Sequence, residues 1–219
     1  MSISIIGAWA AREQSLDEVA SATAKMLATW PGTGHWATPG ETGNNDAVRY
    51  EPLDPSNVTD LTARIAASTA EIKNMKSSGQ HLHITRLDAD GQETMTLRIR
   101  AGFAKPRNRI VATVWMNDIT SAESQRLIRG YMAALIGAWN PDWLEAGTYD
   151  FQKAQGHSHG QVIVGWDTYI SDRIDFDDTA IDGKLATVRG AAGRYVTLDG
   201  TPAEPSLEQA QLVRTALGY

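Results

Sequence analysis

Apolar residues recur along the chain with two different periods, one typical of helices and one typical of strands. Helical spacing begins behind Ser15 and Glu18, whose types and separation match a capping box. This spacing predicts three long helices and a short last one, over about 15–30, 54–78, 120–140 and 206–217. Thr120 and Ser121 can cap the third helix, which is expected to stop at Pro141 because the residue before a proline is disfavoured in the helical region.

Apolar and polar residues alternate, or form short apolar runs, in the rest of the chain. These patterns predict strands over about 2–9, 81–87, 93–100, 109–116, 144–151, 161–170 and 193–198, while 32–43 has the composition of a loop. The short connections from 81 to 116 require antiparallel pairing. The expected fold is therefore a single α+β domain over 1–219. Its sheet is antiparallel or mixed, with six to seven strands packed by three main helices and a short C-terminal helix.

The composition excludes several kinds of chemistry. The chain has 219 residues, a net charge of −6 and no cysteine, so it has no disulfide, thiolate nucleophile or sulfur-ligated metal site. No apolar run approaches the roughly eighteen residues that span a membrane, and the N-terminus lacks the basic leader of a signal peptide. A soluble, cytoplasmic protein without a membrane partner is expected.

The negative charge lies in the second half of the chain. Residues 1–117 contain 12 basic and 12 acidic residues, whereas residues 118–219 contain 8 and 14. Five aspartates fall within 171–182, where Arg173 alone opposes them: Asp172, Asp175, Asp177, Asp178 and Asp182. Such a segment repels nucleic acid and attracts a basic protein surface. A solvated acidic loop is the alternative interpretation.

Histidines and arginines form further clusters. The pairs His81/His83 and His157/His159 have the spacing that puts two ligands on one strand face, but no third ligand stands at a telling distance. No metal or other cofactor is therefore expected, and a metal-dependent hydrolase is only an alternative. Five cations predict a solvated hairpin end or a contact with the aspartates: Arg98, Arg100, Lys105, Arg107 and Arg109.

Two stretches about twenty-five residues apart contain three of the seven tryptophans. Trp139 continues the apolar stripe of the third helix and Trp143 follows the proline turn, so both are expected to clamp the helix end onto the sheet. In the second stretch, Gly165 predicts a bulge or a close backbone approach beside Trp166. A core role is expected for Tyr169, with direct binding as the alternative.

Taken in order, these segments resemble the immunity-protein-52 family of bacterial immunity proteins. The matching positions lie in 7–13, 138–143 and 164–171, and include Trp9, Arg12, Trp139, Pro141, Trp143, Gly165 and Trp166. Asp167 departs from the pattern, because an aliphatic or methionine side chain is expected there.

The resemblance implies a protein that binds and neutralises a cognate secreted toxin. The family is associated with nuclease toxins of restriction-endonuclease-like fold, often delivered by type VI secretion, and its members have no catalytic activity or cofactor. We then expect the toxin interface at the acidic segment, with an aromatic anchor at its base: Tyr169, Asp172, Asp175, Asp177, Asp178 and Asp182. An adaptor module of a secretion apparatus is the alternative of a different class.

Overall fold

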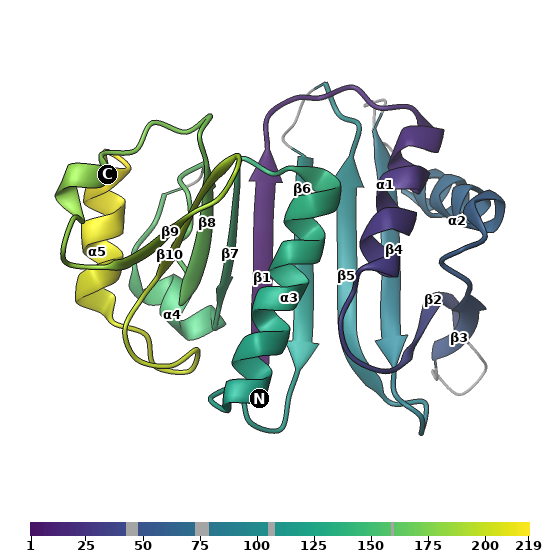
Figure 1. The fold of residues 1–219 in the computed structure, drawn as a ribbon. Helices are drawn as coiled ribbons and strands as arrows, with labels where there is room; N and C mark the ends of the chain where they lie inside the picture. Colours follow the sequence, from purple (N-terminus) through teal and green to yellow (C-terminus); the bar gives the residue numbers. More distant parts are fainter. Residues whose placement is uncertain (43–47, 73–78, 105–107, 159) are drawn as a thin grey trace.

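The computed structural model describes residues 1–42, 48–72, 79–104, 108–158 and 160–219. A ten-stranded sheet runs through this part of the chain in the order β3-β2-β4-β5-β6-β1-β7-β8-β10-β9, with every neighbouring pair antiparallel (Figure 1). The strands are β1 (Ser2–Trp9), β2 (His35–Thr42), β3 (Val48–Leu53), β4 (Gln80–Leu87), β5 (Glu93–Ala101), β6 (Asn108–Trp115), β7 (Trp143–Gly147), β8 (Asp167–Ser171), β9 (Ala186–Arg189) and β10 (Gly193–Thr197).

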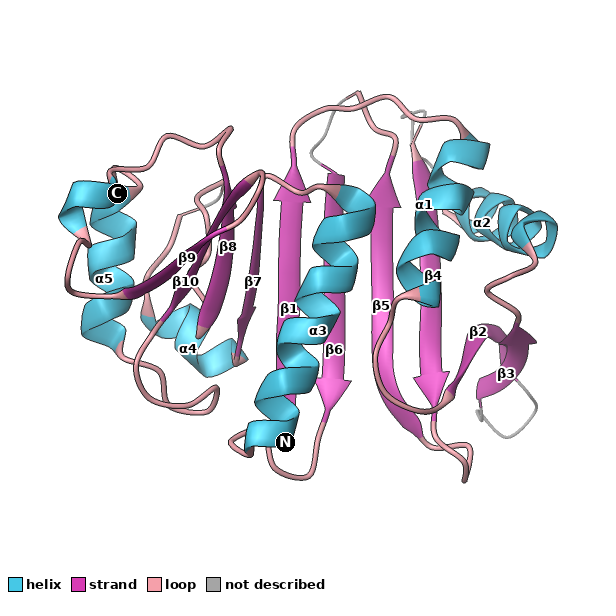
Figure 2. Ribbon diagram, viewed as in Figure 1, coloured by secondary structure: helices cyan, strands magenta, loops and turns pink. Residues whose placement is uncertain are grey.

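Helices cover the two faces of the sheet unequally (Figure 2). They are α1 (Leu16–Ala28), α2 (Val58–Glu71), α3 (Ala122–Trp139), α4 (Tyr149–Ala154) and α5 (Leu207–Ala216), with a 3-10 turn, η1 (Asp178–Ala180). The first three share the main core with one face of the sheet, whereas α4 and α5 pack on the opposite face around β8 and β10. No helix in the described ranges is long and apolar enough to cross a bilayer.

Helices α1 and α3 begin at the capping residues that the sequence offers, whereas α2, predicted from about 54, begins at Val58 behind the N-cap Asn57. Ser15 and Glu18 form the predicted capping box, with Ser15 N donating to Glu18 Oε2 at 2.7 Å and Glu18 N donating to Ser15 Oγ at 3.2 Å. Ser121 caps α3 by accepting from the backbone N–H of Ser124. At its other end α3 stops at Asn140, whose φ of 44° is the left-handed conformation common at helix C-termini, and Pro141 follows.

The α+β class and the antiparallel sheet are confirmed, but the strand count is wrong. The described residues form ten strands instead of six to seven, because β2, β3 and β9 were not predicted. Strand β2 contains Pro39 and Gly40, which usually interrupt strands, and its pairing with β3 shifts register there. Every residue of β9 is exposed, so it lacks the apolar alternation that signals a buried face.

Further boundaries differ from the prediction. The helix predicted over 54–78 corresponds to α2, which ends at Glu71, and residues 73–78 lie outside the described residues. The segment predicted as a strand over 161–170 pairs only from Asp167, and the region predicted as a strand over 144–151 ends as one at Gly147. Helix α4 follows immediately, with the Thr148 side chain accepting from Phe151 N. A six-residue helix has too few turns to display a helical period, so the sequence pattern could not separate it from the strand.

Candidate functional site

The three segments that carry the family resemblance meet near the end of α3, where Asp142 N donates to Ala8 O at 2.9 Å and Ser171 N donates to Asp142 O at 2.8 Å. The Trp9 and Trp139 rings stack with centroids 5.7 Å apart, and both side chains are buried in the main core. Trp139 Nε1 also donates to the Met26 sulfur at 3.3 Å. Trp143 is buried on the opposite face with Ile6. The two tryptophans therefore do not clamp the helix together: Trp139 fastens α3, whereas Trp143 packs beneath the sheet.

Two arginines converge on the last carbonyl groups of α3. Arg12 donates to Trp139 O at 3.0 Å and to Asn140 O at 3.2 Å. Arg173 donates to Asn140 O and Pro141 O, both at 2.9 Å, and forms an ion pair with Asp142 at 2.7 Å. Cations stabilise this end of a helix because its free carbonyls carry partial negative charge. Arg12 and Arg173 thus serve the fold, and Arg173 pairs outside the aspartate segment.

Gly165 lies where the backbone of β7 approaches most closely. A Cβ atom at this position would stand 2.3 Å from Ala146 O and 2.4 Å from Glu145 Oε2. The predicted close approach is therefore confirmed, although Gly165 precedes β8 instead of lying within it. The Gln155 side chain bonds both backbone groups of Val164, which compensates for the missing strand pairing.

The aspartate segment is partly neutralised by two arginines that follow it in the chain. Arg189 on β9 pairs with Asp172 at 2.5 Å and with Asp178 at 3.4 Å. Arg194 on β10, only 6% exposed, pairs with Asp178 at 2.9 Å. These contacts attach the segment to the sheet edge. Their arginines lie outside 171–182, which is why local charge counting missed them.

The other three aspartates of the segment face solvent. Asp177 accepts hydrogen bonds from the backbone N–H and the hydroxyl of Thr179, which lower its pKa. Asp175 and Asp182 are exposed, and neither has a recorded ion pair in the described part of the chain. Within the segment, these two carboxylates make no hydrogen bond or ion pair that stabilises the described part of the fold.

Tyr169, expected as an aromatic anchor at the base of the segment, is a core residue. Its side chain is 2% exposed, its ring packs against Tyr195, and its hydroxyl donates to Ala192 O at 3.0 Å. In this structure the ring supports the turn between β9 and β10, and no surface of it is offered to a partner.

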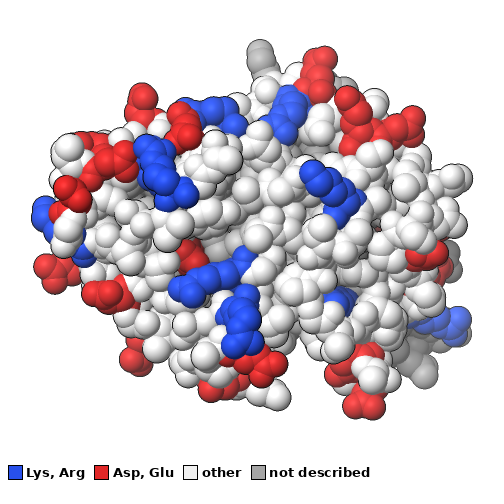
Figure 3. All heavy atoms as spheres, viewed as in Figure 1, with Lys and Arg blue, Asp and Glu red and all other residues white. Residues whose placement is uncertain are grey.

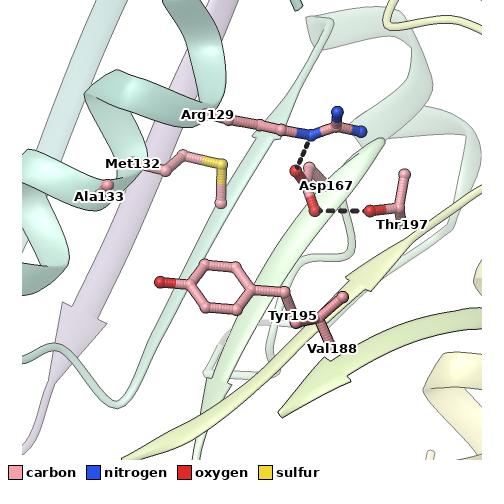
Figure 4. A pocket seen from close by; sticks show the side chains of 7 residues that line it. All are labelled: Arg129, Met132, Ala133, Asp167, Val188, Tyr195 and Thr197. Atoms are coloured by element: carbon pink, nitrogen blue, oxygen red, sulfur yellow. Dashed lines mark hydrogen bonds and ion pairs between the residues drawn. The ribbon is translucent and has the colours of Figure 1, made fainter. Parts of the chain in front are cut away.

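A pocket of about 480 Å³ opens between α3 and the last strands of the sheet (Figure 4). Its lining comes from α3, β8, β9 and β10, and consists of Arg129, Met132, Ala133, Asp167, Val188, Tyr195 and Thr197. Asp167 lies at the wall formed by β8, with Arg129 above it and Thr197 beside it. Residues so far apart in sequence gave no common signal, and the pocket was not predicted.

Asp167 and Arg129 form a pair that is buried at one end and exposed at the other. Arg129 Nε donates to Asp167 Oδ2 at 3.0 Å, and the two side chains are 50% and 4% exposed, respectively. Thr197 donates to the second carboxylate oxygen at 3.0 Å. Burial raises the pKa of Asp167 above its ordinary value even though Arg129 and Thr197 favour its charged form. The guanidinium also lies 4.7 Å above the Trp166 ring, which holds it at the pocket rim.

The ion pair with Arg129 explains how an aspartate is tolerated at position 167, where the resemblance leads us to expect an aliphatic or methionine side chain. A carboxylate in a buried strand position requires a charged or hydrogen-bonding partner, because an unpaired buried charge is costly. The position of Asp167 in the strand pattern could therefore have predicted that a cationic side chain from another segment contacts this strand. The sequence alone did not identify Arg129 as that cation.

The histidine and arginine clusters lie away from this pocket. His81 packs edge-on against Phe103, and His83 lies opposite Arg98 across β4 and β5. Burial, with the neighbouring Arg100 and Arg98, lowers the pKa of both histidines.

In the described residues no three potential metal ligands cluster. His159, Lys105 and Arg107 lie outside the described residues. Strands β1 and β7 separate β6 from β8, so Arg98, Arg100 and Arg109, the described cations of the arginine cluster, are remote from the aspartates.

Glu145 on β7 is the most deeply buried carboxyl group of the described chain. It is 0% exposed; Gln152 donates to its Oε1 at 2.7 Å, whereas its Oε2 has no hydrogen-bond partner. Burial raises its pKa well above the ordinary value of 4.5, against the opposing effects of Arg109 and Gln152. At pH values between the pKa of the unfolded chain and that of the folded chain, the folded chain therefore holds a proton that the unfolded chain has released.

We expect Glu145 to make stability fall as the pH rises. Its contribution is fully present below pH 4.5, the ordinary value, and is lost as the pH rises to the folded-state pKa, by up to about 1.4 kcal/mol per pH unit. Glu145→Gln should remove this slope, so that its advantage over wild type grows with pH in urea unfolding. Glu208→Gln, at an exposed position of α5, controls for the replacement of a carboxylate by an amide. Parallel profiles for wild type and Glu145→Gln would contradict the expectation.

The arrangement defines a class: an α+β protein with a ten-stranded antiparallel sheet and an open pocket at one end of it. No protein-family model and no curated protein matches the chain. Among solved structures, the fold is similar to that of the Pseudomonas aeruginosa type VI secretion system protein PA0821. The TM-score is 0.56 at 10% sequence identity, covering 99% of this chain and 75% of that chain. At this identity the similarity shows the fold alone.

Proposed function

We propose that this chain is an immunity protein that binds a secreted toxin and neutralises it in the cytoplasm without catalysis. The observation that carries the proposal is the fold similarity over 99% of the chain to a type VI secretion system protein. The resemblance to the immunity-protein-52 family also supports it, and its three segments are in contact with one another, since Asp142 N donates to Ala8 O and Ser171 N donates to Asp142 O. A nuclease of restriction-endonuclease-like fold remains the toxin class that the resemblance favours.

Charged and apolar contacts would affect different rates of toxin binding. Opposite charges accelerate association, whereas desolvated apolar anchors slow dissociation. Asp175 and Asp182 are exposed and free of recorded ion pairs in the described chain, so they suit the first task. Tyr169 does not suit the second in this structure, because it is buried.

The direct test is co-expression with the toxin domain encoded beside this chain. Cell survival and a complex that co-purifies are the expected results, and an unrelated toxin of the same class should not be neutralised. Killing without any complex would overturn the proposal. The fold similarity equally suits a binding module of the secretion apparatus, so stable capture of an apparatus component in place of the toxin would favour that second candidate.

The contribution of the aspartates can be tested without disturbing the fold. The double substitution Asp175→Asn, Asp182→Asn removes two exposed charges but leaves the Asp172 and Asp178 ion pairs in place. We expect association with the toxin to slow about tenfold at low salt, with the difference fading at high salt. Stopped-flow association at two ionic strengths measures this effect. Equal rates at low salt would exclude steering by these residues.

A further inference from the structure

The helical layer on the main-core face of the sheet stops before the sheet does. Helices α1, α2 and α3 belong to that layer, whereas α5 packs on the opposite face of β8 and β10. Figure 1 shows α3 as the last helix of the layer on the side toward β10 and β9. Beyond α3, this face of the sheet has no helix to cover it in the described chain, and the pocket lies at that point.

The uncovered strip has the composition of a contact surface. Val188 on β9 is 65% exposed, and Ala133 on α3 is exposed, whereas Met132 at the pocket floor is buried. Tyr195 on β10 lies directly opposite Val188 in the strand register and lines the same pocket. Apolar side chains at different depths thus form a recess into which one side chain of a partner could insert.

The guanidinium of Arg129 lies at the rim of this recess and can accept a further partner. Arg129 donates through Nε to Asp167, and its two terminal nitrogens point away from that carboxylate (Figure 4). Neither terminal nitrogen has a recorded hydrogen-bond acceptor in the described ranges of the chain. Asp167 and Trp166 hold the guanidinium in position, so little conformational freedom would be lost on binding. Terminal guanidinium nitrogens are suited to a carboxylate.

The charges on this face are distributed unevenly. In Figure 3, which views this face, acidic side chains gather mainly at the periphery, whereas the middle is largely uncharged with scattered Lys and Arg. Strand β9 links this face to the aspartate segment, because Arg189 pairs with Asp172 and the adjacent Val188 lines the pocket. A partner seated at this edge would meet both surfaces.

We propose that the pocket between α3 and β8, β9 and β10 is the toxin's anchor site, where an apolar toxin side chain inserts and a neighbouring toxin carboxylate pairs with Arg129. This inference rests on the proposed function, because it assigns the surface through which that function is exerted. It places the slow-dissociation contacts at this pocket instead of at Tyr169. Interface energy typically concentrates in a few such buried anchors.

The test fills the pocket and leaves the fold intact. Ala133→Trp adds a ring at the exposed helix position that lines the recess, and Ala66→Trp adds the same ring at an exposed position of α2 as the matched control. With the purified toxin domain encoded beside this chain, Ala133→Trp should weaken binding about a hundredfold, mainly by faster dissociation. Ala66→Trp should bind as wild type does.

A second pair of variants tests the carboxylate contact. Arg129→Gln alone would leave Asp167 buried without its cation, so Arg129→Gln is combined with Asp167→Asn, which removes both charges. We expect the double variant to bind about tenfold more weakly while thermal unfolding still shows a folded chain. Val188→Glu, at an exposed position, should also weaken binding by placing a carboxylate beside the one on the toxin.

The outcomes separate the two proposals. If wild type binds the toxin and the pocket variants bind equally well, the anchor site is wrong and the immunity function stands. If wild type does not bind, the proposed function itself fails. If Val188→Glu converts a dimer to a monomer without altering toxin affinity, a second copy of this chain occupies the pocket and the anchor site is again wrong. Light scattering with each variant distinguishes this last case.

Discussion

Trp139→Ala should lower the free energy of unfolding by about 3–5 kcal/mol, as expected for truncation of a large buried aromatic side chain. The Trp139 ring is 1% exposed and stacks on Trp9 at 5.7 Å. Its loss would leave a cavity between the end of α3 and β1, and Met26 would lose the contact with the indole nitrogen. Urea unfolding followed by circular dichroism measures the change.

Trp115→Ala is the matched control for that experiment. Trp115 lies on β6 and is 42% exposed, so its truncation removes little buried surface. We expect a loss of about 1 kcal/mol or less. Equal destabilisation by the two substitutions would show that the Trp9–Trp139 stack is not the principal fastening of α3.

Gly165→Ala should destabilise the fold by about 3 kcal/mol, at the upper end of the cost of overpacking. The added methyl group would stand 2.3 Å from Ala146 O, a backbone atom of β7 that pairing holds in place. Either the chain before β8 must shift or β7 must move, and both changes disturb neighbouring strand pairing. Equilibrium urea unfolding gives the loss directly.

Gly137→Ala provides the opposite control. Gly137 lies within α3, and a Cβ atom there would meet no heavy atom within 4 Å. Because glycine is a poor helix former, alanine should stabilise the chain by up to about 1 kcal/mol. Opposite signs at the two glycines would show that close approach, and not the added methyl group itself, sets the cost. A neutral Gly165→Ala would refute the packing argument.

The positions that carry the family resemblance and the positions proposed to bind the toxin are different sets. Trp9, Arg12 and Trp139 hold the end of α3, and Gly165 permits the approach of β7. The proposed anchor site depends instead on residues such as Arg129 and Val188. Under the proposed function, separate sets would allow the pocket and the aspartate segment to vary with the toxin while the fold is kept.

Several elements follow from local chemistry and were therefore predictable. The Ser15–Glu18 capping box and the Ser121 cap involve residues three positions apart, so the chain itself brings their atoms together. The alternation along β5 reflects one buried face and one more exposed face, so it is visible in the sequence. Gly165 also indicated a close backbone approach, because a glycine within a strand pattern has this meaning even when the approaching segment is unknown.

The sequence by itself thus determined the α+β class, the presence of three long helices, the caps of α1 and α3, and the core position of Trp139. Tertiary structure decided the edge strands β3 and β9, which lack alternation because most of their side chains are exposed. It also decided which charges remain available. Arg189 and Arg194 neutralise Asp172 and Asp178 only because β9 and β10 fold back beside them. The pocket exists for the same reason: Arg129, Asp167 and Val188 become neighbours only through long-range packing.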